Sequence, residues 1–279
     1  YTIEVCGSDD DGATTCDTVN ATITNVDPTA VLAEDLYIAH AGEDVEVEGN
    51  STDPGSDDLE AVWDWDITDL DPANSTVTSL VNPPDPDPAK SPSIQPRDVD
   101  WAESHAYAQA CLYDIEFTVT DDDGGSNEDT AVIIITGNES TVRGSGWWMN
   151  QYRNKKPNNF ETGELLCFLS ITNYLSDIFD EVRSPLSARA HAVNVLFVSQ
   201  NKGTAEELFD EQLLAAWLNF ANGSYDLDTP VDTDGDEIND STFEDAVRAA
   251  EAVRLDNTAS RAELLAQKDI LERLVTVSD

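Results

Sequence analysis

Residues 113–136 read YDIEFTVTDDDGGSNEDTAVIIIT, and residues 1–24 repeat this pattern as YTIEVCGSDDDGATTCDTVNATIT, with eleven identical positions at an offset of 112. In both copies apolar and polar residues alternate on either side of an Asp-Asp-Asp-Gly segment. Successive side chains of a strand point to opposite faces, and a tight turn needs a residue that tolerates positive φ. Each copy is therefore predicted to be a β-hairpin.

A repeat at a fixed offset indicates a chain built from modules. The second copy closes a segment that spans residues 28–137, so we expect residues 1–27 to be the final hairpin of a preceding module of the same kind. A hairpin without its own sandwich exposes unpaired edges and an apolar face, and can complete a neighbouring subunit by strand addition. The alternative is that its missing strands belong to a longer precursor.

Between the two copies the sequence is typical of a β-sandwich. Short apolar or alternating runs, separated by Gly, Pro, Asn and Asp, lie at residues 31–33, 45–48, 61–67, 113–119 and 131–135. Short strands with frequent turn signals favour this class of fold. Residues 80–98 are rich in proline, which lacks the N–H that a central strand donates, so we expect an extended loop insertion there.

The motifs of residues 28–136 resemble the polycystic kidney disease (PKD) domain, an immunoglobulin-like β-sandwich. In chain order they are Pro28-Thr29-Ala30, Asn50-Ser51-Thr52-Asp53-Pro54, Trp63-Asp64-Trp65-Asp66, Ser104-His105-Ala106-Tyr107 and Val119-Thr120-Asp121-Asp122-Asp123-Gly124. Two features depart from that family: the usual Phe-Gly-Asp after the first Trp-Asp is replaced, and the Pro-rich insertion lengthens the domain. The resemblance implies a spacer or interaction module of extracellular proteins, not a catalyst.

After Gly137 the apolar period changes from two residues to about 3.6, which predicts helices. We expect a linker at residues 138–146, with Gly144-Ser145-Gly146 as a hinge, and an all-α domain over residues 147–279. Ser-x-x-Glu capping boxes begin at Ser241 and Ser260. The main helices are predicted at residues 161–182, 186–199, 204–221, 242–255 and 260–276. This half opens with Gly146-Trp147-Trp148 and contains the segment QLLAAWLNFANG at residues 212–223 and Asp232-Thr233-Asp234-Gly235-Asp236. Over roughly residues 142–276 it resembles an uncharacterised helical domain found at the C-terminal side of archaeal and bacterial surface proteins.

The four cysteines bear on the cellular compartment. Cys6 and Cys16 occupy opposite arms of the first hairpin, where facing residues of an antiparallel pair come within disulfide distance. We predict a disulfide between them, which implies an oxidising compartment. For Cys111 and Cys167 two alternatives stay open, a covalent clip between the domains and a pair of buried free thiols.

A loop between two predicted helices has the spacing of a calcium site. Ca²⁺ takes about six to eight oxygen ligands, and carboxylates at alternate positions of a loop supply them. The predicted ligands are the side chains of Asp232, Asp234, Asp236 and Asp240, the carbonyl of Ile238, and Glu244 to close the shell. The loop departs from the EF-hand pattern and is closer to the calcium loops of thrombospondin type 3 and dockerin modules. The alternative is a solvated acidic turn in which Glu244 only caps a helix.

Several weaker candidates accompany this loop. Two acidic groups are further candidate ion sites, although Asp-rich turns also arise for backbone reasons alone; they are Asp53, Asp57 and Asp58, and Asp121, Asp122 and Asp123. Sequons that permit N-glycosylation of an exported chain occur at Asn20, Asn50, Asn74, Asn138, Asn222 and Asn239. Trp63 and Trp65 are expected to be a core and a surface aromatic of one strand rather than a sugar platform.

The net charge excludes several functions. A formal charge of −43, from 57 acidic and 14 basic residues, repels nucleic acid and anionic membranes, so neither is an expected partner. No apolar run reaches the roughly 20 residues that span a bilayer. The three histidines lack nucleophile or metal-ligand companions at informative spacing, and the sequence has no phosphate loop, zinc motif or nucleophile elbow. We therefore expect no enzymatic activity.

These observations together predict an extracellular, Ca²⁺-stabilised structural protein of a surface layer, sheath or filament. Its expected partners are copies of itself or other surface proteins, with glycans as a further option. The first alternative is a non-catalytic accessory region of a large secreted hydrolase, acting as a spacer or carbohydrate binder. The second alternative is a glycan-binding adhesin.

Overall fold

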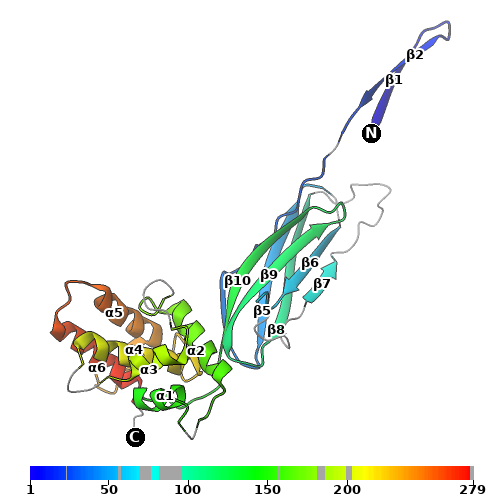
Figure 1. Ribbon diagram of the computed structural model, residues 1–279. Helices are drawn as coiled ribbons and strands as arrows, with labels where there is room; N and C mark the ends of the chain where they lie inside the picture. Colours follow the sequence, from blue (N-terminus) through cyan, green and yellow to red (C-terminus); the bar gives the residue numbers. More distant parts are fainter. Residues whose placement is uncertain are drawn as a thin grey trace.

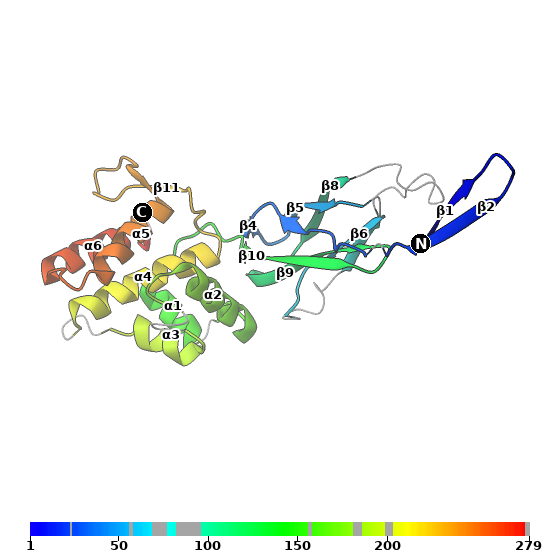
Figure 2. The ribbon, with the colours of Figure 1, turned by 90° about the horizontal axis from the view of Figure 1, so that it is seen from above.

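The structure of the chain is a computed structural model that describes residues 1–22, 24–55, 58–68, 77–81, 96–155, 158–180, 186–198 and 203–276. Three parts follow one another along the molecule: an N-terminal hairpin, a β-domain and a helical domain (Figure 1). Figure 2 shows the same order from above. The predicted fold class, an immunoglobulin-like β-sandwich followed by an all-α domain, is confirmed.

Two sheets make up the β-domain. The larger sheet has the strand order β4-β10-β9-β6-β7, and the smaller has the order β3-β5-β8. All pairs are antiparallel except β4 with β10, which is parallel. The strands are β3 (Val31–Leu32), β4 (Leu36–His40), β5 (Asp44–Asp53), β6 (Leu59–Asp64), β7 (Val77–Val81), β8 (Arg97–Ala106), β9 (Cys111–Asp121) and β10 (Ser126–Thr136). Most of the Pro-rich insertion, residues 82–95, lies outside the described residues.

Alternation along the strands builds the core of the sandwich. In β9 every second side chain from Cys111 to Asp121 is buried, as expected of a strand with one face on the core. Burial stabilises the fold by about 1.5–3 kcal/mol for each large apolar side chain. The largest side chains in this core are aromatic: Trp63, Trp65, Trp101, Tyr107, Tyr113 and Phe117.

Trp65 is buried, so its prediction as a surface aromatic is wrong. Residues two apart in an extended chain share a face, so Trp65 continues the buried face of Trp63 just beyond the end of β6 at Asp64. The Trp65 ring stacks on His105 with 5.2 Å between centroids, and its carbonyl accepts a 2.7 Å hydrogen bond from the Tyr107 hydroxyl. The Trp-Asp and His-x-Tyr motifs therefore meet in one buried cluster.

Six helices form the described part of the second domain. They are α1 (Ser145–Tyr152), α2 (Thr162–Leu175), α3 (Arg189–Leu196), α4 (Ala205–Ala221), α5 (Phe243–Leu255) and α6 (Arg261–Leu274). Helix α4 contacts each of the other five and is buried along most of its length. Its Trp217 and Phe220 pack against Phe243 of α5, with ring centroids 5.8 and 6.0 Å apart. Helix α4 is therefore the centre of the helical core.

Helix α1 is absent from the predicted helices because Gly144-Ser145-Gly146 has the composition of a hinge. In the structure the helix begins at Ser145 within that segment. Trp148 and Tyr152 are buried, and the Trp148 indole donates to the side chain of Asn219 in α4 at 3.2 Å. Packing against α4 therefore stabilises a helix that local propensity does not favour.

Several other helix ends differ from prediction, and α3 spans residues 189–196 rather than 186–199. Helix α2 ends early because the Ser176 hydroxyl accepts two backbone hydrogen bonds of the following turn. Helix α5 is capped by Thr242, whose hydroxyl accepts the N–H of Asp245, so the cap lies one residue after the predicted Ser241. Helix α6 begins in the predicted capping box at Ser260.

A packed and covalently closed joint connects the two domains. Of the two alternatives for Cys111 and Cys167, the structure has the disulfide, which links the start of β9 to α2. Ile134 of β10 belongs to the helical core rather than to the sandwich core. The His40 Nε2 atom of β4 lies 3.0 Å from a carboxylate oxygen of Asp226, which follows α4.

Two glycines allow the backbones to meet at this joint. The N–H of Gly137 donates to the carbonyl of Ala221 at 2.9 Å, directly after β10 ends. A Cβ atom at Gly137 would lie 2.4 Å from the Asn222 carbonyl oxygen. Gly223 has a φ of +91°, and a Cβ atom there would lie 1.9 Å from the Gly137 carbonyl oxygen. A side chain at either position would push the domains apart.

The N-terminal hairpin consists of β1 (Thr2–Ser8) and β2 (Thr14–Asn20) and projects away from the sandwich (Figure 1). Cys6 faces Cys16 in the strand register, and a disulfide joins them. Every residue of both strands is exposed. The segment that follows is attached to the sandwich by Asn25, whose amide donates to the Asp121 carboxylate at 2.7 Å.

Candidate metal site

A short two-stranded ladder closes the acidic loop of residues 232–240 at its base. Strand β11 (Pro230–Val231) pairs antiparallel with β12 (Ser241–Thr242). Thr242 is also the N-cap of α5, so the loop leads directly into this helix. The conformation of the loop is therefore coupled to the start of α5.

Asp232 organises the backbone of the loop. Its carboxylate accepts the N–H groups of Asp234, Gly235 and Glu237 at 3.1, 2.6 and 2.7 Å. Gly235 and Glu237 have φ values of +87° and +67°, which wrap the chain around the carboxylate. These N–H groups, that of Gly235 first, hold the pKa of Asp232 below its usual range. The side chain therefore stays ionised as the pH falls.

Three carboxylates converge at this turn. One oxygen each of Asp232, Asp234 and Asp236 lies within 4.8 Å of the other two. The Oδ1 atoms of Asp234 and Asp236 each accept the N–H two residues further on, at 3.1 and 2.9 Å, which orients both side chains. Like charges at such a separation repel one another unless a cation lies between them.

The two other predicted carboxylates, of Asp240 and Glu244, have protein partners of their own. The Asp240 carboxylate accepts both the N–H and the hydroxyl of Thr233 at 2.9 Å, which holds the two ends of the loop together. Glu244 lies in the first turn of α5, with the Arg248 guanidinium 3.7 Å from its carboxylate. The Ile238 side chain is exposed at the tip of the loop. The structure thus brings three of the five predicted carboxylates together.

The loop is also attached to the end of α6. The guanidinium of Arg273 donates to the carbonyl of Thr233. A cavity of about 620 Å³ lies beside the loop, and its lining includes Thr141 after β10, Tyr225 after α4, and Asp232. The Tyr225 hydroxyl donates to a carbonyl at the end of α6 at 2.8 Å. The acidic loop therefore contacts α6 and the segment that joins the domains.

The donor set fits a hard divalent cation such as Ca²⁺. Carboxylate oxygens are its preferred ligands, and backbone carbonyls and water complete such shells. Residues 232–240 include no histidine or cysteine, the ligands that zinc favours.

In the first of the weaker acidic groups, Asp53, Asp57 and Asp58, two carboxylates already interact with groups of the protein. Asp53 is buried, and its Oδ1 accepts the N–H of Gly55 at 2.5 Å. Burial raises the pKa of Asp53, and the neighbouring Asp121 charge adds to this effect. Asp58 lies 2.9 Å from the Arg97 guanidinium, and Asp57 lies outside the described residues.

The second weaker group forms the turn between β9 and β10. Asp121 is buried, and its carboxylate accepts the Gly125 N–H at 2.7 Å as well as the Asn25 amide. Asp122 and Asp123 are exposed. Asp121 therefore serves the turn and the connection to the hairpin, as the backbone explanation of such turns expects.

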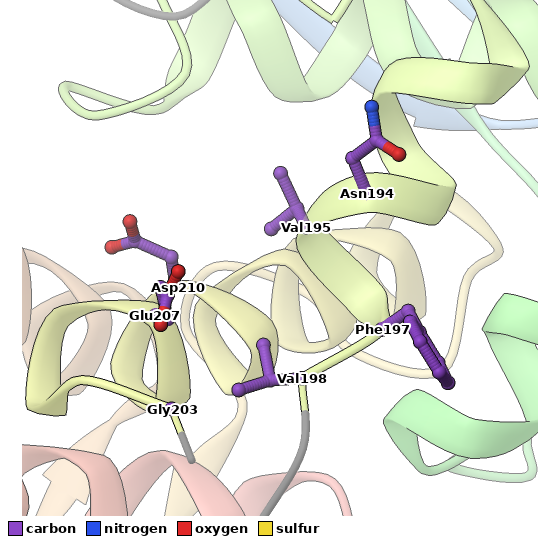
Figure 3. A pocket seen from close by; sticks show the side chains of 7 residues that line it. All are labelled: Asn194, Val195, Phe197, Val198, Gly203, Glu207 and Asp210. Atoms are coloured by element: carbon purple, nitrogen blue, oxygen red, sulfur yellow. The ribbon is translucent and has the colours of Figure 1, made fainter.

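A cavity that no sequence pattern predicted lies between the end of α3 and the start of α4 (Figure 3). It has a volume of about 400 Å³. Asp210 in its wall is held by Arg254 at 2.9 and 3.1 Å, and Glu207 accepts the N–H of Thr204 at 2.8 Å. Both carboxylates therefore have protein partners. The lining residues are Asn194, Val195, Phe197, Val198, Gly203, Glu207 and Asp210.

The structure separates the six sequons by accessibility. Asn222 is buried at the domain joint, where a glycan has no room. The Asn50 amide donates to Asp98 and Asp100 at 3.0 and 2.9 Å. Asn74 lies outside the described residues. The exposed sequon asparagines are Asn20, Asn138 and Asn239.

Comparison with known proteins gives limited similarity. No family model and no curated protein matches the chain. Among solved structures, the chain is similar to the PKD domain of an M14-like peptidase from a Thermoplasmatales archaeon, with 12% identity, 40% of this chain and 98% of that chain covered, and a TM-score of 0.30.

Two further solved structures are similar to part of the chain. Superoxide reductase (neelaredoxin) from Ignicoccus hospitalis has 10% identity, with 38% of this chain and 79% of that chain covered and a TM-score of 0.26. The ASH / PapD-like domain of human CEP192 has 10% identity, with 43% of this chain and 95% of that chain covered and a TM-score of 0.25. The sheet order and strand register of the chain itself define its fold.

In the part of the chain that the structure describes, no helix combines the length and the apolar character needed to cross a membrane.

Proposed function

We propose that this chain is a structural segment of an extracellular assembly, such as a surface layer, sheath or filament, and that Ca²⁺ at residues 232–240 stabilises its helical domain. The joint between the domains is the observation that carries the proposal. It combines the Cys111–Cys167 disulfide, the backbone contact at Gly137 and the burial of Ile134 in the helical core. Such a joint suits a protein that keeps a fixed spacing, because neither domain can swing freely.

The cysteines and the charge support an extracellular setting. All four cysteines are in disulfides, which are typical of oxidising compartments. A formal charge of −43 opposes close association of copies unless counter-ions are present. Divalent cations outside the cell would supply them, which links the acidic surface to the proposed setting.

The aromatic side chains support a structural role over glycan binding. A sugar platform needs an exposed aromatic ring. The least buried tryptophan is Trp147, which is half-buried and has the Arg143 guanidinium 5.0 Å from its ring centroid. The other five tryptophans are buried: Trp63, Trp65, Trp101, Trp148 and Trp217. The exposed aromatic rings Tyr1, Tyr174 and Phe197 lie on separate segments of the chain. The adhesin and carbohydrate-binding alternatives therefore have less support.

The proposed role of Ca²⁺ follows from the position of the acidic loop. Without a cation, the converging carboxylates of Asp232, Asp234 and Asp236 repel one another. The loop leads into α5 through Thr242 and is attached to α6 through Arg273. Removing the ion is therefore expected to loosen both helices.

Calorimetric melting of the intact chain, with Ca²⁺ and with chelator, tests the metal site. We expect Ca²⁺ to stabilise the helical domain by about 2.7 kcal/mol when its concentration is 100 times the dissociation constant. Asp232→Asn/Asp236→Asn should abolish the shift. The matched control Asp10→Asn/Asp11→Asn removes the same number of charges from an exposed turn, and this variant should retain the Ca²⁺-dependent shift. A helical transition that chelator leaves unchanged in the unmodified chain contradicts the calcium role.

Electron microscopy of the native material tests the assembly role. We expect ordered layers or filaments in the presence of Ca²⁺ and loss of order after chelation. Particles that remain dispersed under both conditions would contradict the assembly role. The metal site is tested separately, by the calorimetric experiment.

A further inference from the structure

We infer that the N-terminal hairpin supplies the last two strands of a second β-sandwich, one that lacks its own final hairpin. The inference goes beyond the proposed function, because it names the kind of partner that the hairpin fits. The hairpin of β9 and β10 has the same pattern of residues and lies inside a complete sandwich. Its neighbours there show what a partner of the N-terminal hairpin would have to provide.

The turns of the two hairpins have the same hydrogen bonds at an offset of 112 residues. The Asp9 N–H donates to the Ala13 carbonyl at 3.0 Å, and the Ala13 N–H donates to the Asp9 carboxylate at 2.8 Å. Asp121 and Gly125 form the same two bonds, at 2.9 and 2.7 Å. The glycines of these turns have φ values of +88° and +90°, at Gly12 and Gly124.

One face of the hairpin is apolar and exposed, whereas the matching face of β9 and β10 is buried. The register places Ile3 opposite Val19, so the apolar side chains form one patch. Its members are Tyr1, Ile3, Val5 and Val19, with exposures of 84%, 49%, 67% and 58%. The matching residues are 5% exposed or less: Tyr113, Ile115, Phe117 and Ala131.

The smaller sheet covers this face in the complete sandwich. A Cβ atom at Gly49 of β5 would lie 2.9 Å from the Phe117 ring, so the two sheets are in close contact at this position. Val5 occupies the position of Phe117 in the first hairpin. The partner is therefore expected to bring a second apolar sheet over Val5 and its neighbours.

Both edges of the hairpin are open in the described residues, where β1 and β2 form a sheet of two strands. In the complete sandwich the outer edge of β9 pairs antiparallel with β6, and the outer edge of β10 pairs parallel with β4. The partner is therefore expected to place an antiparallel strand beside β1 and a parallel strand beside β2.

Asp17 is a polar residue of the apolar face and is positioned like Asp129. The Oδ1 atoms of Asp17 and Asp129 accept the N–H groups of Thr18 and Thr130, each at 2.9 Å. In the complete sandwich the Oδ2 atom of Asp129 also accepts the N–H of Leu32 in β3 at 2.8 Å. We expect Asp17 Oδ2 to accept an N–H from the corresponding strand of the partner, which makes Asp17 a positioning residue.

The disulfide lies on the opposite face, so it does not obstruct docking. Cys6 and Cys16 match Thr118 and Glu128, which face each other on the outer side of the large sheet. The covalent link holds the two strands in register before a partner binds, which lowers the entropy cost of association. A second copy of the described sandwich is not the partner, because its own β9 and β10 already occupy these positions.

The test extends the intact chain by placing a second copy of residues 28–112 ahead of Tyr1, with Cys111→Ser in the added copy to avoid an unpaired thiol. Strands equivalent to β3–β8 then precede the first hairpin as they precede Tyr113. We expect hydrogen exchange of the β1 and β2 amides to slow by at least about 100-fold as they join a cooperative unit. Ile3→Glu/Val5→Glu should abolish this protection, whereas Thr2→Glu/Ser8→Glu on the opposite face should retain it.

A second extended chain distinguishes two causes of missing protection: imperfect packing of the first hairpin on the added strands, and a partner of another kind. In it four of the five face residues that differ between the hairpins are matched by Val5→Phe, Gly7→Val, Val19→Ala and Ala21→Ile, while Thr15, the turn and the disulfide remain. Absence of protection in both extended chains overturns the inference. Concentration-dependent protection in the unextended chain also overturns it, because the partner is then a second copy of the hairpin. Neither measurement depends on Ca²⁺, so failure here leaves the proposed function intact.

Discussion

The buried carboxylate of Glu251 in α5 connects three helices of the helical domain. Its Oε1 accepts hydrogen bonds from the Ser176 hydroxyl at 2.6 Å and from the Trp217 indole N–H at 3.0 Å. The Arg248 guanidinium lies 3.3 Å from Oε2. The Glu251 side chain is fully buried, so water cannot replace these partners.

Glu251→Ala removes the acceptor of all three groups. A buried polar group left without a partner costs about 1–3 kcal/mol, and breaking a buried charge pair costs about 3–5 kcal/mol. Arg248 is partly exposed and keeps a hydrogen bond to the Leu175 carbonyl, so the lower part of that range applies. We expect the free energy of unfolding to fall by about 3–4 kcal/mol. Glu251→Gln keeps the Oε1 acceptor and should cost only about 1 kcal/mol.

Urea unfolding followed by far-ultraviolet circular dichroism measures this free energy, because the helices dominate the signal. The reasoning is refuted if Glu251→Ala costs less than about 1 kcal/mol, the net value of one hydrogen bond, or if both variants cost the same. The pH dependence gives an independent check. Burial raises the pKa of Glu251 above its usual value of 4.5, so its contribution is fully present below that pH and is lost as the pH rises through the folded-state pKa. The unmodified chain should lose more stability over this interval than Glu251→Gln, because the other buried carboxyls with raised pKa values, such as Asp53 and Asp210, contribute equally in both.

Two further predictions concern the joint between the domains. Gly137→Ala should destabilise the chain by about 1–3 kcal/mol, because its Cβ would lie 2.4 Å from the Asn222 carbonyl oxygen. Gly163→Ala in α2 meets open space and should stabilise by about 0.5–1 kcal/mol, and equal melting temperatures of the two variants would contradict the close approach. Peptide mapping by mass spectrometry of the native protein should find any glycans on exposed sequons such as Asn239 and none on Asn222. A modified Asn222 would mean that the joint opens.

Local patterns were sufficient to predict most elements of secondary structure. The alternation and turn in residues 113–136 identify a hairpin, because strand faces and turn conformations depend on neighbouring residues alone. The capping box at Ser260 is likewise read within one helical turn. The facing of Cys6 and Cys16 follows from hairpin register in the same way.

Predictions that depend on distant contacts were less successful. Helix α1 was missed because the burial of Trp148 against α4 outweighs the hinge-like composition of its first turn. Trp65 was assigned to the surface although it lies two residues after Trp63 and therefore shares its buried face, and its stacking on His105 is a tertiary contact. In the acidic loop, spacing indicated six ligands, but the attachment of Asp240 to Thr233 is visible only in three dimensions.

The order of residues alone was enough to establish the repeated hairpin, the change from strands to helices and the clustering of carboxylates at residues 232–240, since each depends on spacing over a few residues. Tertiary structure was needed to establish that Gly137 meets Asn222, which sequons are accessible, and that the apolar face of the first hairpin is uncovered. These properties depend on which segments pack together across tens of residues. The hydrophobic effect is non-directional, so it favours many different arrangements of the same apolar segments. Which arrangement forms is therefore visible only in the folded structure.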